Sequence, residues 1–170
     1  ALLNFLISRE ARRYVTVALA GVGGDELFAG YPRYQGAQGS LAFEQLPRAW
    51  RQALAAWSSC WPESTTSTNW PGRAKRFLQG AALPRPQRYL TWITFAAADM
   101  KHTLYAPRLR EALGSNDACA PHRRILEEAP GGYVDQVLRL DLLTYLPDDL
   151  LVMADKMSMA NSLELRVPYC

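Results

Sequence analysis

Three glycines and two acids stand close together in residues 20–26, which read AGVGGDE. Glycine carries no Cβ and tolerates a positive φ, so backbone N–H groups in such a loop can approach an anion such as a phosphate. Asp25 follows at once, and a carboxylate beside a phosphate is repulsive unless a cation lies between them. The spacing therefore indicates a phosphate–Mg²⁺ site. The alternative is a tight strand-to-helix turn, with Asp25 as the N-cap and Glu26 in the first turn.

Two familiar glycine motifs do not match this loop. The dinucleotide fingerprint G-x-G-x-x-G needs a glycine at position 26, where Glu26 stands. A Walker phosphate loop needs G-K-S or G-K-T after four intervening residues, and that sequence does not occur. The sequence therefore excludes a Rossmann dinucleotide site and a Walker nucleotide site.

The segments around the loop predict the elements that must position it. Residues 14–19 are aromatic, apolar or β-branched and carry no charge, which is typical of a parallel strand that is covered on both faces. Leu2 to Arg13 carries apolar residues at helical spacing, with arginines near its end, where cations suit the helix dipole. The order helix, strand, glycine loop and acidic helix start predicts an α/β sheet with the loop at the carboxyl end of the strand.

Everything after Tyr34 is predicted as helix and connection. Helices are expected at 46–61, 73–83, 88–100, from Pro107 and at 133–146, with Pro147 ending the last one. A polar loop is expected at 62–72, and turns are expected at 114–117 and 129–132. Two of the helices carry apolar residues at helical spacing, which predicts faces that pack in a core. These residues are Trp50, Leu54, Trp57 and Trp61 in one helix, and Tyr89, Trp92, Ile93 and Phe95 in the other.

Composition narrows the class of protein. The 170 residues carry a net charge of +3 that is spread along the chain, which argues against a nucleic-acid partner. Three cysteines in no C-x-x-C spacing predict a reduced cytoplasmic protein with no structural metal. No apolar run approaches the ~20 residues that span a bilayer, and no signal peptide opens the chain, so we expect no membrane partner. Both ends read as cut, which predicts a fragment of a larger domain.

Two blocks of the sequence resemble the synthetase domain of glutamine-dependent asparagine synthetases. They are VTVALAGVGGDELFAGYPRY, residues 15–34, and LDLLTYLPDDLLVMADKMSMANSLELRVPY, residues 140–169. The resemblance implies an ATP-pyrophosphatase-type (adenine nucleotide alpha hydrolase-like) α/β domain. Residues 1–170 would be a predominantly helical part of it, with a parallel strand at about 14–20. That family converts aspartate and ATP to aspartyl-AMP and pyrophosphate, and ammonia that a glutaminase domain releases from glutamine then attacks.

The resemblance also assigns cofactors, partners and site residues. It implies ATP and Mg²⁺ as cofactors, a glutaminase domain in the full-length chain, and a homodimer as one possible assembly. Catalytic roles fall on Asp25, Glu26 and Lys156, and the metal falls on Asp25. Residues implied to line the nucleotide and aspartate site are Gly21, Val22, Gly23, Gly24, Asp155, Glu164 and Arg166.

Several of these residues also have a purely structural interpretation. Lys156 is equally read as a solvated surface lysine. Glu164 and Arg166, two apart in an extended segment, point to one face and would anchor that segment by ion pairs with other parts of the domain. Residues 145–149 read as a helix stop followed by an N-cap. The methionines of this block are expected in the core: Met153, Met157 and Met159.

The sequence departs from the family pattern S-G-[DE]-G-[GS]-D-E at two loop positions. Ala20 lacks the serine hydroxyl, and Val22 lacks the carboxylate; in β-lactam synthetases a tyrosine stands at that second position. Met153 replaces the usual Lys or Arg. The S-G-G-x-D-S pyrophosphate loop and the glutaminase cysteine do not occur in the chain, so we expect no activity from this polypeptide alone. Two alternatives follow: a ligase that closes a β-lactam or isopeptide bond, and a non-catalytic homologue that acts as a binding protein.

Overall fold

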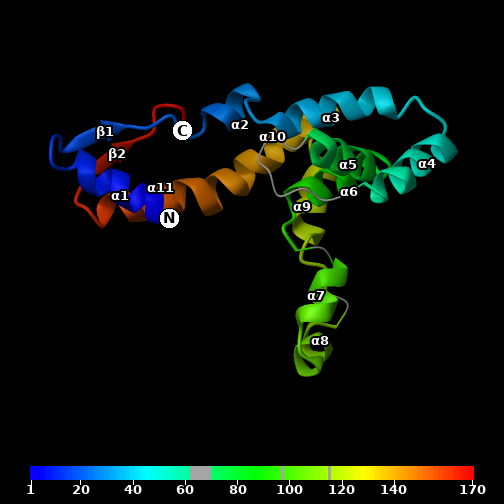
Figure 1. The fold of residues 1–170 in the computed structure, drawn as a ribbon. Helices are drawn as coiled ribbons and strands as arrows, with labels where there is room; N and C mark the ends of the chain where they lie inside the picture. The colour runs from blue at the N-terminus through cyan, green and yellow to red at the C-terminus, as the bar shows by residue number, and fades with distance from the viewer. Residues whose placement is uncertain (62–69, 97, 115) are drawn as a thin grey trace.

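The computed structural model describes residues 1–61, 70–96, 98–114 and 116–170, and this part of the chain is mostly helical (Figure 1). The helices are α1 Leu2–Ala11, α2 Gly24–Phe28, α3 Pro32–Phe43, α4 Arg48–Ser59, α5 Trp70–Ala81, α6 Arg85–Ile93, α7 Ala98–Leu104, α8 Pro107–Leu113, α9 Ala120–Glu128, α10 Tyr133–Leu143 and α11 Val152–Met159. A π-helical turn, η1, spans Leu146–Leu151, and the strands are β1 Val17–Leu19 and β2 Glu164–Arg166.

The two strands form a parallel pair, which confirms the predicted parallel strand and the α/β class. Val17 lies opposite Glu164 and Leu19 lies opposite Arg166. The prediction that this strand is covered on both faces is wrong for the described residues, because 74% of Leu19 is exposed. In this part of the chain β1 pairs with β2 alone, and the face that carries Val17 and Leu19 is exposed.

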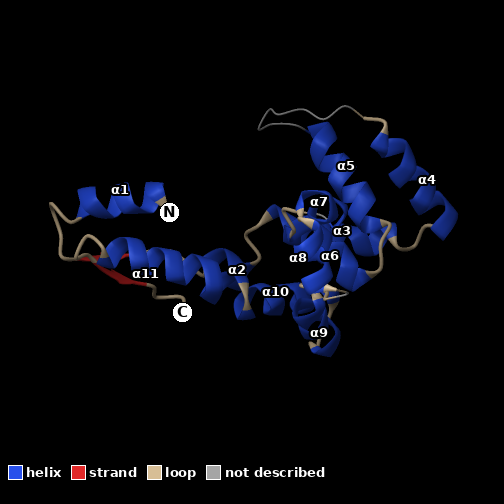
Figure 2. Cartoon of the chain, turned by 90° about the horizontal axis from the view of Figure 1, so that it is seen from below, coloured by secondary structure: helices blue, strands red, loops and turns tan. Residues whose placement is uncertain are grey.

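The elements gather at two ends of a long helical segment made of α10, η1 and α11 (Figure 2). At one end α1 packs on α11, and α11 packs on β2. At the other end α3 and α9 pack on α10, and α6 packs on α9. The helix predicted to stop at Pro147 stops earlier, because α10 ends at Leu143 and Thr144 leaves the helical conformation with φ −129° and ψ −68°. Pro147 lies in the first turn of η1, where its missing N–H leaves no hydrogen bond unmade, and the chain stays helical through residues 145–149.

The core lies at the α10 end of this segment. Its buried side chains come from α3, α6, α9 and α10 and are Tyr34, Ala37, Tyr89, Leu90, Leu126, Tyr133, Val137 and Leu140. The prediction that Tyr89 packs in a core is confirmed, and Trp92 and Ile93 pack partly buried against the same cluster. Burial of apolar surface stabilises by roughly 25 cal/mol per Å², so this cluster holds the four helices together.

The predicted core face of 46–61 is wrong, because Trp50 and Trp57 are exposed. The helix it belongs to, α4, packs mainly against α5, and Trp57 instead meets Trp61 edge to face at 4.9 Å between ring centroids. Met159 is likewise exposed rather than in the core.

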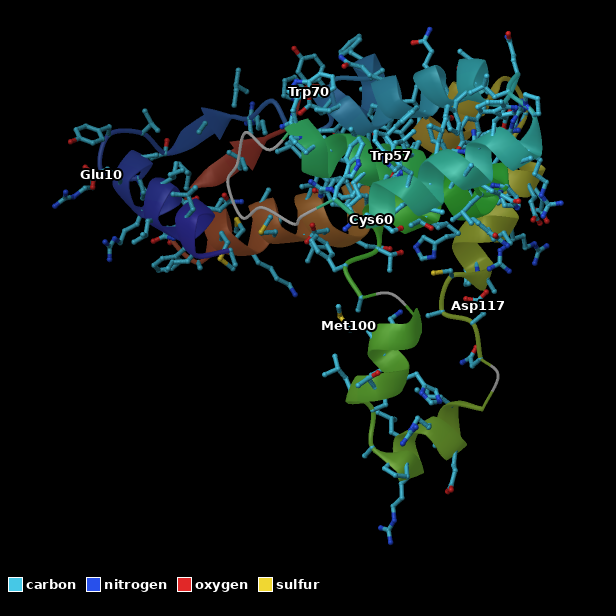
Figure 3. All side chains as sticks on the ribbon, turned by 45° about the vertical axis from the view of Figure 1, so that its right-hand side comes forward. Glu10, Trp57, Cys60, Trp70, Met100 and Asp117 are labelled. Atoms are coloured by element: carbon cyan, nitrogen blue, oxygen red, sulfur yellow. The ribbon has the colours of Figure 1, made fainter. Side chains whose placement is uncertain are left out.

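The predicted single helix at 88–100 is two helices. The first, α6, ends at Ile93, Thr94 is extended, and Phe95 is fully exposed. The second, α7, begins an arm with α8 that projects from the rest of the molecule, with Met100 on the arm and Asp117 where the chain returns (Figure 3). The prediction of a helix from Pro107 is confirmed by α8.

The predicted loop at 62–72 lies mostly outside the described residues, and its last three residues open α5. The predicted turn at 114–117 lies partly outside them. The turn at 129–132 is confirmed between α9 and α10. No helix in the described ranges is long and apolar enough to cross a bilayer.

Candidate functional site

The glycine loop leaves the carboxyl end of β1 and is held against the C-terminal residues. Ala20 N donates a hydrogen bond to Arg166 O at 2.9 Å, which continues the strand pairing into the loop. Gly23 has φ 91° and is the N-cap of α2. A Cβ at Gly23 would lie 2.6 Å from Cys170 Sγ, so both the backbone conformation and the space require glycine here. The loop and the end of the second sequence block therefore form one structure.

Three consecutive backbone N–H groups of this loop have no acceptor in the described part of the chain. Among the described residues, no carbonyl or side chain accepts from the N–H of Gly21, Val22 or Gly23. Gly21 is exposed, and nothing lies within 4 Å of the position its Cβ would take. Unpaired N–H groups at such a loop are ready donors for an anion.

The two acids after the loop have different environments. Asp25 is exposed, and its carboxylate makes no hydrogen bond or ion pair with a described residue. Only 1% of Glu26 is exposed, and its Oε1 accepts a hydrogen bond from Tyr31 Oη at 2.7 Å. The prediction that Asp25 caps the helix is wrong, because Gly23 holds that position; the placement of Glu26 in the first turn is confirmed.

Tyr31 connects Glu26 to a cation. Burial, and then the hydrogen bond to Glu26 and the charge of Glu26, raise the pKa of the Tyr31 hydroxyl, so it stays protonated as a donor. The guanidinium carbon of Arg33 lies 4.3 Å from the centre of the Tyr31 ring and 4.7 Å from that of Tyr145. A guanidinium between two aromatic faces gains cation–π attraction from both.

Asp141 forms an ion pair with Arg33 in the interior. Its Oδ2 lies 2.8 Å from Arg33 Nη2 and accepts hydrogen bonds from Tyr34 Oη at 2.6 Å and Tyr89 Oη at 2.5 Å. Burial, together with Asp141, raises the pKa of both tyrosines. This buried network joins α3, α6 and α10 directly behind the acidic turn.

Sequence reasoning missed the residues of this network. The sequence does contain one indication of the network. Asp141 is a lone acid four residues after Val137, on the apolar face of a predicted helix. A charge on such a face is rarely left without a partner. Arg33 and Tyr34 stand in the first block, where only the glycines and acids were interpreted.

The charged residues of the second block lie near the loop only in part. Arg166 pairs through its backbone with the start of the loop, but its side chain binds Glu164 Oε1 at 2.8 Å. That exposed pair joins the two residues to each other, so the expected ion pairs with other parts of the domain are not formed in the described chain. Asp155 and Lys156 are exposed on α11, and neither makes an ion pair with a described residue.

The groups around the glycine loop suit a phosphate-bound Mg²⁺ rather than an enclosed metal ion. Among the described residues, no group of three His, Cys, Asp or Glu side chains could enclose a metal ion. Mg²⁺ usually takes one or two carboxylates and completes its shell with water and substrate phosphate oxygens, rather than with an all-protein cage. Asp25 is exposed, and neither its carboxylate nor the three N–H groups beside it has a partner among the residues that the structure describes, which fits that mode of binding.

A parallel strand pair, with a glycine loop at its carboxyl end and an acidic first turn after it, defines an α/β domain. The family model described as asparagine synthase matches residues 1–170, so the chain belongs to that family, whose domain has the ATP-pyrophosphatase-type fold.

Curated relatives agree with this assignment. A Mycobacterium tuberculosis (strain ATCC 25618 / H37Rv) protein, provisionally named asparagine synthetase (glutamine-hydrolyzing), is 37% identical over 166 residues. Asparagine synthetase (glutamine-hydrolyzing) 1 of Bacillus subtilis (strain 168) is 32% identical over 168 residues. Each match covers 97% of this chain and 24% of the relative, so the chain spans about a quarter of the length of these proteins. No solved structure matches the chain.

Proposed function

We propose that residues 1–170 are part of a synthetase domain that adenylates aspartate with ATP, releases pyrophosphate, and forms asparagine with ammonia from glutamine. One observation carries the proposal: the free N–H groups of Gly21, Val22 and Gly23 beside the unpartnered carboxylate of Asp25. The names of the relatives support the same activity. In the proposal, a glutaminase domain in the full-length cytoplasmic protein supplies the ammonia, and two subunits can associate.

The residues of the site divide the work as follows. The loop N–H groups donate to phosphate oxygens of ATP, and Gly24 lets the first turn of α2 lie close to them. Asp25 would hold Mg²⁺, which neutralises negative charge on the pyrophosphate as it departs. Glu26 is buried against Tyr31 and orients the turn rather than touching substrate.

Positive charge near the departing group is assigned to the second block. Lys156 and Arg166 are proposed to face the pyrophosphate, and Asp155 and Glu164 to line the same cleft. Adenylation benefits from fixed positive charge where negative charge develops. Glu164 already neutralises Arg166 in the described chain, so this role requires the pair to separate when nucleotide binds.

Val22 stands at the loop position where the family has a carboxylate, so its side chain bears directly on whether the site is active. It is partly buried and offers no group for proton transfer. Loss of such a group costs on the order of a hundred- to ten-thousand-fold in rate where proton transfer limits the reaction. This observation supports the second candidate, a non-catalytic homologue that binds nucleotide, and it leaves room for a ligase that closes a β-lactam or isopeptide bond.

The test is aspartate-dependent pyrophosphate release from Mg-ATP by the complete gene product that contains this chain. Val22→Asp is compared with the unmodified protein. Val22→Asn is the matched control, because asparagine has nearly the size of aspartate but no charge. Release by the unmodified protein supports a synthetase that works without the loop carboxylate.

Other outcomes separate the alternatives. Activity that appears only in Val22→Asp supports the non-catalytic homologue. Release that depends on a different carboxylic acid supports the other ligases. No aspartate-dependent release from any variant contradicts the proposed function.

A further inference from the structure

We propose that Gly30 is a positioning residue for Asp25: the missing side chain at Gly30 gives the Asp25 carboxylate the space in which it lies. What the positioned carboxylate does rests on the proposed function. That it is positioned by Gly30 rests on geometry alone.

The chain folds back on itself between the two residues. Ala29 ends α2 in the left-handed conformation, with φ 57° and ψ 39°, and this brings Gly30 under the first turn of the helix. Gly30 N then donates a hydrogen bond to Asp25 O at 2.9 Å. A Cβ on Gly30 would collide with Asp25 Oδ1, and it would lie 2.9 Å from Asp25 Cγ and 3.2 Å from Asp25 Cα. The two closest of these atoms belong to the carboxylate.

The requirement for glycine at this position is steric. Positive φ among the described glycines occurs at Gly23, Gly114 and Gly131, so the backbone of Gly30 is one that alanine also adopts. Alanine at position 30 therefore adds one methyl group without backbone strain. The atoms that this methyl group would strike belong to Asp25.

The side chain of Asp25 takes most of the movement in response, since its carboxylate makes the closest contacts and the turn around it is held by a hydrogen bond. Glu26 and Tyr31, which flank the turn, are joined by their hydrogen bond, and Glu26 is buried. The carboxylate of Asp25 has no partner among the described residues to hold it in place. A methyl group at Gly30 is thus expected to turn Asp25 into another rotamer, with only a slight shift of the first turn of α2 where the methyl group meets Asp25 Cα.

Displacement of this carboxylate has a measurable consequence for a cation. Mg²⁺ requires near-ideal octahedral geometry with oxygen ligands at about 2.0–2.1 Å, so a turned carboxylate cannot reach the same ion. Changing a group that orients a metal ligand typically lowers metal affinity by about tenfold to a hundredfold. Gly30→Ala should weaken metal binding by roughly that factor.

Crystal structures of the complete gene product and its Gly30→Ala variant test the geometry without reference to activity. We expect Asp25 in a different rotamer, with the Glu26–Tyr31 hydrogen bond retained. An unmoved Asp25 carboxylate in the variant would overturn the inference.

Binding of Mn²⁺ in the presence of pyrophosphate, measured by electron paramagnetic resonance, tests the consequence. The variants are Gly30→Ala, Asp25→Ala and the double variant, and Gly39→Ala is the control because the nearest atom to its added Cβ lies 3.9 Å away. We expect weaker binding in Gly30→Ala, no change in Gly39→Ala, and no further loss when Gly30→Ala is added to Asp25→Ala.

The remaining outcomes distinguish the two proposals. If Asp25→Ala weakens binding and Gly30→Ala does not, the positioning role is overturned and the metal role of Asp25 stands. A further loss from Gly30→Ala in the Asp25→Ala background also overturns it. If Asp25→Ala binds Mn²⁺ as the unmodified protein does, the proposed metal role fails, and the crystal structures alone decide the role of Gly30.

Discussion

At the scale of single residues, Asp141 is the centre of the buried polar network that links three helices. One of its oxygens meets Arg33, Tyr34 and Tyr89 at 2.5–2.8 Å, with the carboxylate almost fully buried. A buried charge without its counter-charge is costly, because the remaining partner is left in a medium of low dielectric. The ion pair with Arg33 and the hydrogen bonds from the two tyrosines therefore depend on one another.

Asp141→Asn should lower the free energy of unfolding by about 3 kcal/mol, because Arg33 loses its counter-charge in the interior. Urea unfolding followed by far-UV circular dichroism measures this. Asp148→Asn is the control, since Asp148 is exposed and should change stability by less than about 0.5 kcal/mol. Equal effects of the two substitutions would show that the network contributes no stability.

The residue types predicted the glycine loop but not the separate roles of the two acids that follow it. Backbone geometry explains both outcomes. The glycine loop was found from spacing because Gly23 has a conformation that few other residues adopt. The sequence does not show that Asp25 is exposed and Glu26 is buried, because nothing in the residue types of two adjacent acids distinguishes them. Only the turn that places Tyr31 over Glu26 distinguishes them.

At the scale of elements, Glu44 joins α3 to α6 through two arginines. Its Oε1 accepts from Arg88 Nη2 at 2.8 Å, and its Oε2 accepts from Arg85 Nη2 at 2.7 Å. Arg88 is fully buried, with Ser40 Oγ and Leu83 O as its other acceptors. The hydrogen bond from Arg85, and then that from Arg88, lower the pKa of Glu44 below its ordinary 4.5, although burial opposes the shift.

Glu44→Gln should destabilise the protein by about 3 kcal/mol at pH 7, because Arg88 stays buried without a full counter-charge. A carboxyl whose folded pKa is depressed stabilises the folded state above its unfolded pKa. That stabilisation disappears as pH falls from about 4.5 through the folded pKa. The difference in melting temperature between the two proteins should therefore shrink from pH 7 to pH 3.

Glu10→Gln provides the comparison, since Glu10 forms an exposed pair with Arg13 on α1. An exposed pair contributes about 0–1 kcal/mol. A difference between Glu44→Gln and the unmodified protein that stays constant with pH would contradict the assigned role of the Glu44 charge.

Helix existence was predicted well and helix packing poorly. Spacing located most helices, but it could not tell that the apolar face of α4 lies away from the core, because periodicity reports a face and not its partner. Pro147 was read as a stop because proline removes a donor, yet the π-helical turn uses it where no donor is needed. Pairing of residues 17–19 with 164–166 depends on tertiary contacts that one sequence does not display.

At the scale of the whole molecule, stability is distributed unevenly between the two ends. The buried cluster belongs to α3, α6, α9 and α10, whereas α1 and β1 expose most of their apolar side chains. The glycine loop lies with the second group, at the carboxyl end of β1 (Figure 1). Regions with few buried apolar contacts open locally at low cost in free energy.

Native-state hydrogen exchange should follow this division. We expect the slowest amides in α3, α6 and α10, with protection near that of global unfolding, because the side chains of Tyr34, Tyr89 and Leu140 become exposed only when the core separates. Amides of α1 and of residues 17–19 should exchange faster, through opening of the two-stranded sheet alone. Equal protection at both ends would mean that β1 opens only with the core. Faster exchange beside the glycine loop would leave it able to adjust around a ligand while the Asp141 network stays closed behind it.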